Sequence, residues 1–214
     1  MKIVVAGDKN FKPYVDKAVE YNNRLGYETL VYDLGELGYG KSFIGRVGTE
    51  NNAKIPCKPH IIEDALLSAE DNETVIWLDA DALIVQPINE IEADIFDIGV
   101  TVRQPKQKEH PLPINAGIVF AKKTENALRF IKEWKTLSDQ GISDQPPLNK
   151  LSAVNSTNIG DTVVRNDVLI KVYPCAIYNN FYFAKKKSPH AKILHYKSKL
   201  RYLYPLDGET YDIR

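Results

Sequence analysis

The sequence predicts an α/β fold in which a mostly parallel, mixed β-sheet is flanked by helices. Short β-branched runs such as Lys2–Ala6 alternate with segments of helical periodicity such as Pro13–Leu25, and this alternation is typical of parallel sheets. The run Val75–Val85 is apolar almost throughout, as expected of a strand that is covered on both faces. With 214 residues, of which 43% are hydrophobic, we expect a single domain over residues 1–214, either complete or excised from a longer chain.

Charge and cysteine content exclude several classes of function. Lysine plus arginine and aspartate plus glutamate each total 28, so the formal net charge is zero. A neutral chain has no overall electrostatic attraction for nucleic acid or an anionic membrane. Cys57 and Cys175 lack a CxxC spacing, which indicates neither a zinc site nor a disulfide framework and favours a reduced, cytoplasmic setting. Met1 leads directly into a predicted strand, and no apolar segment is long enough for a membrane span.

The first third of the chain is expected to form a βαβ unit. The run Lys2–Ala6 ends at a Gly-Asp pair, and Pro13–Leu25 carries apolar residues at helical spacing before Gly26, which suits a helix C-cap. Glu28–Tyr32 is the next strand. Because ligands of parallel sheets bind at the carboxyl ends of strands, the turn after the first strand is a candidate binding site.

The middle of the chain supplies the central strands. Gly35–Pro56 is rich in Gly, Lys and Asn and predicts a loop with one short element, whereas Pro59–Ser68 predicts a helix with proline in its first turn. The strand over Val75–Val85 follows, then an acidic connection over Asn89–Asp97 and a strand over Ile98–Val102.

The second half continues the alternation. Arg103–Pro113 is polar and contains three prolines, so we expect a mobile loop that could close over a bound ligand. Asn115–Ala121 predicts a strand, and Thr124 suits the N-cap of a helix. Beyond that helix, the expected elements are a short helix over Ser143–Leu151 and strands over Val168–Val172 and Ala191–His195.

Asp79 and Asp81 interrupt the apolar run of the central strand. Unpaired charges there would be costly, so something must neutralise them. In an extended chain, residues two apart point the same way and lie about 6 to 7 Å apart, so both carboxylates can converge on one cation. Mg²⁺ and Mn²⁺ take carboxylate oxygens and complete their shells with substrate phosphates. The alternative is that both aspartates are solvated at a frayed strand end.

A late histidine is followed by a basic segment. His195 ends an apolar strand, and Lys197, Lys199 and Arg201 come directly after it. A nitrogen ligand among Lys and Arg donors is what a diphosphate bridged to a metal ion needs. Taken alone, the segment equally fits a solvated basic face, and the histidine a structural residue. The joint occurrence with Asp79 and Asp81 favours a site.

The order of these elements resembles GT-A-fold glycosyltransferases of the retaining, family-8-like kind, including the small amino-terminal glycosyltransferase domains of chlorovirus capsid-glycosylating enzymes. The resemblance covers most of the chain. It is carried by Lys58-Pro59, Ile76–Ile84 with its Asp-Ala-Asp, Ile114–Phe120 with its Asn-Ala-Gly, Ser143–Pro146 with its Asp-Gln, and Leu194–Lys199. One departure is that the His-x-x-Gly-x-x-Lys pattern of the family here begins His195-Tyr-Lys-Ser-Lys and lacks the glycine. The resemblance therefore leaves open which lysine reaches the phosphate.

The resemblance implies a role for each matching residue. Asp79, Asp81 and His195 would bind Mn²⁺ or Mg²⁺ bridging the two phosphates of a nucleotide sugar, with UDP expected from the habit of the family. Nucleoside and phosphate contacts are expected from Ala6, Gly7, Asp8, Tyr14, Lys58, Ala80, Lys197 and Lys199. Asn115, Ala116 and Gly117 would border the sugar, and Asp144 and Gln145 would face its anomeric carbon.

The implied reaction moves a sugar from a UDP-sugar donor to a hydroxyl of a glycan or glycoprotein acceptor. The family resemblance favours retention of configuration, in which Asp144 and Gln145 position the substrate. An inverting reaction would need a carboxylate base, for which Asp144 is the candidate.

Three other interpretations compete with this one. A haloacid-dehalogenase-like phosphatase would use Asp79 as nucleophile, Asp81 as acid and base, and Asp161 with Asp167 as a distal Mg²⁺ pair. A nucleotidyltransferase needs a glycine-rich loop, which the turn at Gly7 is not. An inactive nucleotide-binding or sugar-binding module remains a third interpretation. The polar and aromatic segment Tyr178–Phe181 is a candidate edge for an acceptor groove in the enzyme or in such a module.

Overall fold

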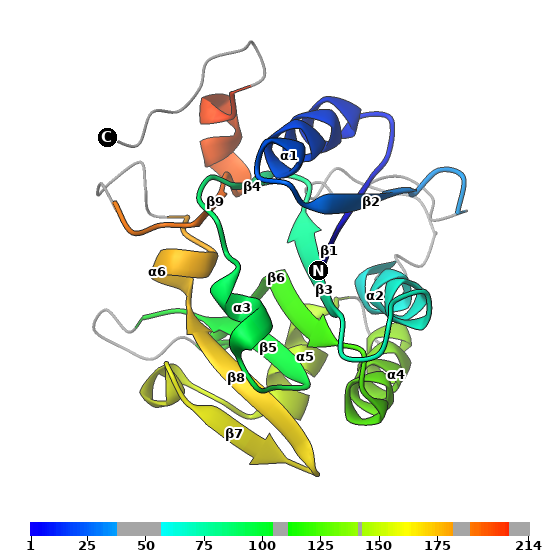
Figure 1. Cartoon of the computed structure of the whole chain (residues 1–214), viewed down its shortest axis with the longest axis vertical. Helices are drawn as coiled ribbons and strands as arrows, with labels where there is room; N and C mark the ends of the chain where they lie inside the picture. The colour runs from blue at the N-terminus through cyan, green and yellow to red at the C-terminus, as the bar shows by residue number, and fades with distance from the viewer. Residues whose placement is uncertain (38–56, 105–110, 141–142, 182–188, 206–214) are drawn as a thin grey trace.

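A computed structural model describes residues 1–37, 57–104, 111–140, 143–181 and 189–205 (Figure 1). Its centre is a mixed, seven-stranded sheet accompanied by a separate two-stranded sheet. In spatial order the large sheet contains β2 (Glu28–Asp33), β1 (Lys2–Gly7), β3 (Thr74–Asp79), β6 (Ile114–Lys122), β5 (Ile98–Val102), β8 (Val168–Pro174) and β7 (Thr162–Arg165). The small sheet pairs β4 (Ala82–Ile84) with β9 (Ile193–His195).

Parallel and antiparallel pairings both occur in the large sheet. β1 is parallel to β2 and β3, and β5 is parallel to β8, whereas β6 is antiparallel to β3 and β5, and β7 is antiparallel to β8. The expected βαβ opening is confirmed, because α1 joins the parallel strands β1 and β2. The helices are α1 (Lys12–Arg24), α2 (Cys57–Leu67), α3 (Glu90–Ala93), α4 (Glu125–Asp139), α5 (Gln145–Ser152) and α6 (Cys175–Tyr178), with 3₁₀ turns η1 (Ser156–Asn158) and η2 (Ser198–Leu203).

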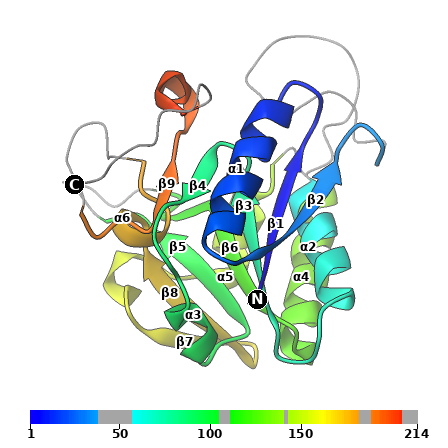
Figure 2. The same cartoon turned by 45° about the horizontal axis from the view of Figure 1, so that its top comes forward.

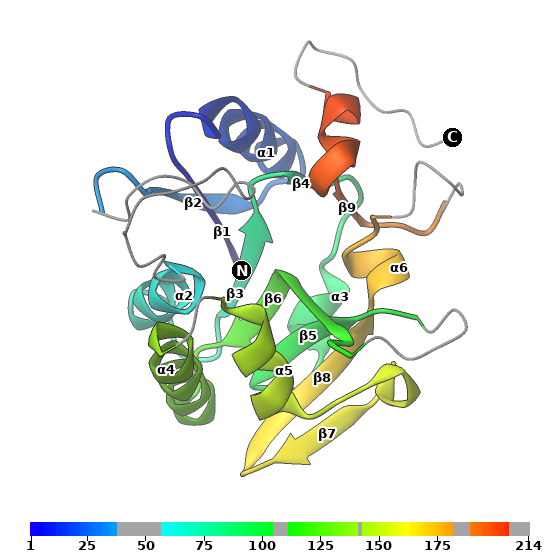
Figure 3. The ribbon, with the colours of Figure 1, turned by 180° about the vertical axis from the view of Figure 1, so that it is seen from behind.

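Helices cover both faces of the large sheet, so its central strands are buried on both sides. Figure 2 shows α1 in front of the sheet, and α2 and α4 side by side. Val4 of β1 and Trp77 of β3 pack in the core with α2 and α4, whereas Val5 and Leu78 pack in the core with α1 and the small sheet. This alternation is the two-residue period of a strand. Viewed from behind, α5 lies beside α4 (Figure 3).

The chain turns between the two aspartates, so the expectation of one strand over Val75–Val85 is wrong. β3 ends at Asp79, Ala80 and Asp81 form a turn, and β4 belongs to the other sheet. The two carboxylates are therefore not successive residues on one face of an extended strand. Their convergence comes from the turn, which sequence periodicity does not report.

The small sheet brings the late histidine to this turn. β4 and β9 pair antiparallel with Ala82 opposite His195, and the backbone N–H of Tyr196 donates to the carbonyl of Asp81 at 2.7 Å. Residues separated by more than a hundred positions along the chain thus become neighbours through strand register.

The sequence analysis missed the edge strand β7. Its residues are mostly exposed and lack a buried face, so it carries little hydrophobic signal. The turn into β8 is formed by Asn166 and Asp167, both with positive φ, and such residues are typical of tight hairpins. Most of the loops expected over Gly35–Pro56 and Arg103–Pro113 lie outside the described residues. Within the described ranges, none of the helices combines the length and apolar character that crossing a bilayer requires.

Candidate functional site

A cavity of about 350 Å³ opens where β1 and β3 end and β6 begins. Parallel register sets Ala6 beside Asp79, and the start of β6 brings Asn115 to the same place. The lining residues are Ala6, Gly7, Asp8, Phe11, Leu34, Cys57, Lys58, Trp77, Asp79, Ala80, Asp81, Leu112, Asn115, Ala116, Gly117, Ser143, Asp144, Gln145, Pro146, Lys197 and Arg201.

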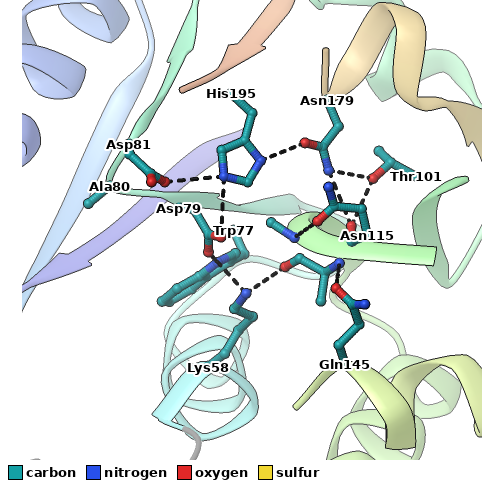
Figure 4. A network of polar contacts seen from close by, with 12 residues as sticks. Lys58, Trp77, Asp79, Ala80, Asp81, Thr101, Asn115, Gln145, Asn179 and His195 are labelled. Atoms are coloured by element: carbon teal, nitrogen blue, oxygen red, sulfur yellow. Dashed lines mark hydrogen bonds and ion pairs between the residues drawn. The ribbon is translucent and has the colours of Figure 1, made fainter. Parts of the chain in front are cut away.

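Two carboxylates in the wall of this cavity and an imidazole behind them converge on one place (Figure 4). The Nε2 atom of His195 lies 3.2 Å from Oδ1 of Asp81 and 3.7 Å from Oδ2 of Asp79. One ligand atom from each of the three residues lies within 4.8 Å of the others. Carboxylate oxygens with one imidazole nitrogen are a donor set that suits Mn²⁺ or Mg²⁺, so the residues fit such an ion.

Asn179 orients the imidazole from behind. Its Nδ2 donates to the backbone carbonyl of Asn115 at 3.2 Å and to the hydroxyl of Thr101 at 2.8 Å. The Asn115 carbonyl can only accept a hydrogen bond, so the Asn179 atom that faces it is the amide nitrogen. The amide Oδ1 of Asn179 therefore faces Nδ1 of His195, at 2.8 Å. Because this oxygen accepts, Nδ1 carries the hydrogen. In the neutral ring Nε2 is then the atom with the lone pair, and it faces the carboxylates.

Asp81 is the most buried carboxylate of the site. Its side chain is 6% exposed, and its Oδ2 accepts from Nε of Arg201 at 2.7 Å. Burial would raise the pKa of Asp81, but the hydrogen bonds and positive charges of His195 and Arg201 outweigh burial and hold that pKa well below its usual range. Asp81 is therefore ionised at neutral pH.

Lys58 joins Asp79, a candidate metal ligand, to the opposite side of the cavity. Its ammonium lies 3.0 Å from Oδ1 of Asp79 and 3.0 Å from Oδ2 of Asp144, and donates to the carbonyl of Ala116 at 2.6 Å. Burial would lower the pKa of Lys58, but the attraction of Asp144 and Asp79 prevails and raises it. Trp77 adds an indole N–H bond to Oδ1 of Asp79 at 2.7 Å.

Helix α5 is fastened to the start of β6, and this contact places Asp144 and Gln145. The side chain of Asn149 accepts from the Ile114 N–H at 2.9 Å and donates to the Ile114 carbonyl at 3.3 Å, as a neighbouring strand would. The Trp134 indole donates to the carbonyl of Asp144 at 2.7 Å. Oε1 of Gln145 accepts weakly from the backbone N–H of Ala116, at 3.4 Å.

Gly117 allows the imidazole to approach the sheet. A Cβ atom at this position would lie 2.4 Å from Cε1 and 2.7 Å from Nδ1 of His195, and 3.1 Å from Oδ2 of Asp79. Real side chains do not reach such distances. Only glycine leaves room for His195 and Asp79 together.

Most residues expected at the site lie together. Thirteen of them line the cavity: Ala6, Gly7, Asp8, Lys58, Asp79, Ala80, Asp81, Asn115, Ala116, Gly117, Asp144, Gln145 and Lys197. His195 is 2% exposed and lies behind the two aspartates. Tyr14 does not line the cavity, because its ring packs 4.7 Å from the ring of Tyr204. The side chain of Lys199 lies outside the described residues.

Two important contacts escaped the sequence analysis. Asn179 belongs to the segment expected at the edge of an acceptor groove, yet it is fully buried behind His195, and its neighbour Asn180 is only 3% exposed. Arg201 is expected only as one of several phosphate donors, although it pairs with Asp81. A signal for Arg201 existed, because it stands six residues after His195, where the family pattern His-x-x-Gly-x-x-Lys has its lysine.

The phosphatase interpretation is contradicted by the positions of its second acidic pair. Asp161 and Asp167 are exposed at the two ends of the edge strand β7, and neither lines the cavity with Asp79. A thiol nucleophile is also disfavoured, because burial raises the pKa of Cys57 to about 11 and keeps the thiol protonated at neutral pH.

Solved glycosyltransferases share this architecture. A glycosyltransferase involved in the glycosylation of the major capsid of PBCV-1 superposes with a TM-score of 0.58 at 19% identity, covering 92% of this chain and 94% of that chain. The galactosyltransferase LgtC, solved with donor and acceptor sugar analogues, superposes with a TM-score of 0.54 at 13% identity over 93% and 88% of the two chains. GlyE of Streptococcus pneumoniae TIGR4 gives 0.57 at 13% identity, over 92% of this chain but 54% of its own.

These likenesses show that the chain has the GT-A fold, as the sequence predicted. No protein-family model matches the sequence, and neither does any curated protein.

Proposed function

We propose that the protein is a metal-dependent glycosyltransferase that moves a sugar from a UDP-sugar to a hydroxyl of a glycan or glycoprotein, with retention of configuration. The observation that carries this proposal is the convergence of Asp79, Asp81 and His195 beside the cavity at the carboxyl ends of β1 and β3. Ligands of open α/β sheets bind at such strand ends. The GT-A fold supports the same conclusion by analogy.

The residues fit a divalent ion and a diphosphate together. Mn²⁺ or Mg²⁺ held by Asp79, Asp81 and His195 would supply positive charge that stabilises a leaving diphosphate. Lys197 and Arg201 line the same cavity and offer further donors to the phosphate oxygens. Ala6, Gly7 and Asp8 line the cavity at the end of β1, and in our proposal they contact the nucleoside.

The start of β6 is suited to holding the transferred sugar. Among the described residues, the buried Nδ2 of Asn115 has no hydrogen-bond partner, and a sugar oxygen entering the cavity would satisfy it. Gln145 and Asp144 lie across from this segment.

Retention is favoured because Asp144 is already engaged. Its Oδ2 bonds the ammonium of Lys58 at 3.0 Å, and its side chain is only 15% exposed. A base for an inverting attack must instead reach the acceptor hydroxyl. In our proposal, Asp144 positions Lys58 and the sugar, and the acceptor hydroxyl attacks from the side of the leaving group.

Calorimetric titration of UDP into the purified protein, with Mn²⁺ present and then with Mn²⁺ chelated, tests the proposal first. We expect binding that depends on Mn²⁺, followed by hydrolysis or transfer when UDP-sugars are screened. Retention is tested by the anomeric configuration of the product, read by NMR. Absence of UDP binding in both conditions would contradict the proposal.

An inactive binding module is the remaining alternative. It predicts metal-dependent UDP binding without turnover of any UDP-sugar. A screen that includes several donor sugars, with free UDP release as the readout, separates the two.

A further inference from the structure

The side chains of Trp77 and Asp79 leave strand β3 on the same face of the sheet, because the two residues are two positions apart in an extended segment. The indole Nε1–H of Trp77 donates to Oδ1 of Asp79 at 2.7 Å (Figure 4). Trp77 is 4% exposed and packs in the core with α2 and α4. The indole is therefore a firmly packed donor beside a candidate metal ligand.

The two oxygens of the Asp79 carboxylate have different surroundings. Oδ1 accepts the indole N–H of Trp77 and also lies 3.0 Å from the ammonium of Lys58. Oδ2 lies 3.7 Å from Nε2 of His195, on the side of the candidate metal site. Rotation of the carboxylate would break the bond to Trp77. This bond therefore keeps Oδ2 directed toward the position of an ion.

Lys58 and Trp77 contribute differently to the state of this carboxylate. Lys58 carries its charge on a flexible four-carbon stem, and the same ammonium bonds Asp144 and the carbonyl of Ala116. An indole has a single N–H with a fixed direction. The Trp77 ring also flanks the lysine, since its centre lies 5.3 Å from the ammonium. Lys58 therefore compensates the charge of Asp79, and Trp77 sets its direction.

We propose that Trp77 is a positioning residue for the divalent ion: its indole N–H holds Oδ1 of Asp79 and thereby turns Oδ2 toward the ion. This inference rests on the proposed function, which requires that ion. Because an indole N–H can only donate, Trp77 is not itself a ligand. Partners that orient ligating groups typically change metal affinity by about 10-fold to 100-fold. The loss of this bond should therefore be measurable as weaker Mn²⁺ binding.

Titration with Mn²⁺, followed by electron paramagnetic resonance, tests the inference. Trp77→Phe keeps an aromatic ring at this position but has no N–H. We expect its Mn²⁺ affinity to be about tenfold weaker than that of the wild type. Circular dichroism shows whether the variant is folded. A folded Trp77→Phe with the Mn²⁺ affinity of the wild type overturns the inference.

Trp134→Phe is the matched control. Trp134 is the second of the two tryptophans of the chain and belongs to the same core cluster. Its indole donates at the same distance, 2.7 Å, but to the backbone carbonyl of Asp144. Each variant loses one ring and one hydrogen bond, so both should have a lower melting temperature. Only Trp77→Phe should bind Mn²⁺ more weakly. Equal losses of Mn²⁺ affinity would indicate general destabilisation and overturn the inference.

The wild-type protein allows a measurement that does not depend on the folding of Trp77→Phe. Its two indole N–H groups can be followed by NMR, and Trp134→Phe assigns them. Because Trp77 lines the cavity, its N–H would meet water if Asp79 turned away. We expect this hydrogen to stay protected from solvent exchange when Mg²⁺, a diamagnetic ion, is bound. Loss of protection on Mg²⁺ binding would show that Asp79 leaves Trp77, which contradicts the inference.

The outcomes separate this inference from the proposed function. A wild type that binds UDP only with Mn²⁺, together with unchanged Mn²⁺ affinity in Trp77→Phe, overturns the inference and leaves the proposed function standing. A wild type that binds neither Mn²⁺ nor UDP overturns both.

Discussion

The carboxylates on the two sides of the cavity have different bonding partners. On the side formed by α2, α5 and β6, which we call the Lys58 wall, one ammonium lies 3.0 Å from both Asp79 and Asp144 and bonds the Ala116 carbonyl. On the side formed by the turn, β9 and η2, the Asp81 wall, Asp81 and His195 meet at 3.2 Å with Arg201 bonded from the outer edge. Asp79 belongs to both walls, because Oδ1 faces Lys58 and Oδ2 faces His195.

This difference separates a structural ion pair from a candidate ligand site. In the Lys58 wall the cation belongs to the protein, so the carboxylates are compensated without a ligand. In the Asp81 wall, Nε2 of His195 faces the carboxylates while Nδ1 bonds Asn179. When the ring is neutral, its Nε2 lone pair and the carboxylate oxygens point to one place, an arrangement that suits a bound cation. Changes in the Lys58 wall should therefore act on stability, and changes in the Asp81 wall on binding and turnover.

The largest effect is expected from Asp81→Asn. Asparagine keeps the shape but removes the charge that the ion requires, so metal-dependent transfer should fall by about 10³-fold, the scale of losing one electrostatic group at a reacting centre. The circular dichroism spectrum should be unchanged. Asp161→Asn, an exposed carboxylate outside the cavity, is the control and should transfer at the wild-type rate. Retained activity in Asp81→Asn would remove the distinction between the two walls.

Lys58→Met tests the other wall. Methionine fills similar space but leaves Asp79 and Asp144 without their shared cation, and breaking a buried ion pair costs about 3 to 5 kcal/mol of unfolding free energy. Urea denaturation measures this. Lys12→Met breaks an exposed pair with Asp16, in which both side chains are more than half exposed, and should change stability by less than about 1 kcal/mol. An equal cost for both variants would mean that Lys58 is not the structural cation of its wall.

Gly117→Ala probes the junction of the walls. The added Cβ would lie 2.4 Å from Cε1 of His195, so the imidazole must shift, at a cost of about 1 to 3 kcal/mol for overpacking. We expect both a lower melting temperature and weaker Mn²⁺ binding. Gly35→Ala is the control, since among the described residues its Cβ would meet only the Asp33 side chain, at 3.1 Å. Wild-type Mn²⁺ affinity in Gly117→Ala would show that the position of His195 is not critical.

The smallest effect is expected from Asn179→Ala. Losing the acceptor at Nδ1 frees the imidazole to rotate and change tautomer, and such outer contacts typically contribute 10-fold or more, so we expect about tenfold weaker Mn²⁺ affinity. Titration with manganese, followed by electron paramagnetic resonance, measures it. Asn126→Ala, which removes a bond to the distant Asp167 carbonyl, should bind Mn²⁺ as the wild type does. An unaltered affinity in Asn179→Ala would make Asn179 a packing residue only.

The sequence by itself determined the α/β alternation, the opening βαβ unit and the place of the polar residues along the chain. These depend on short-range patterns: the apolar run before Asp79, the helical spacing in α1, and glycine at position 26 with φ of 79°. The paired aspartates and the turn after β1 could be predicted from the residues, because ligands of parallel sheets bind at strand ends. The other expected lining residues, such as Lys58, Asn115 and Asp144, came from the family resemblance.

Tertiary structure decided the rest. The pairing of β4 with β9 and the bond from Arg201 to Asp81 join residues more than a hundred positions apart, and both contacts meet at the turn formed by Ala80 and Asp81. Strand register and the packing of η2 set these contacts, and local sequence does not encode them. For the same reason Asn179, which looks like an exposed loop residue in the sequence, is fully buried as the partner of His195.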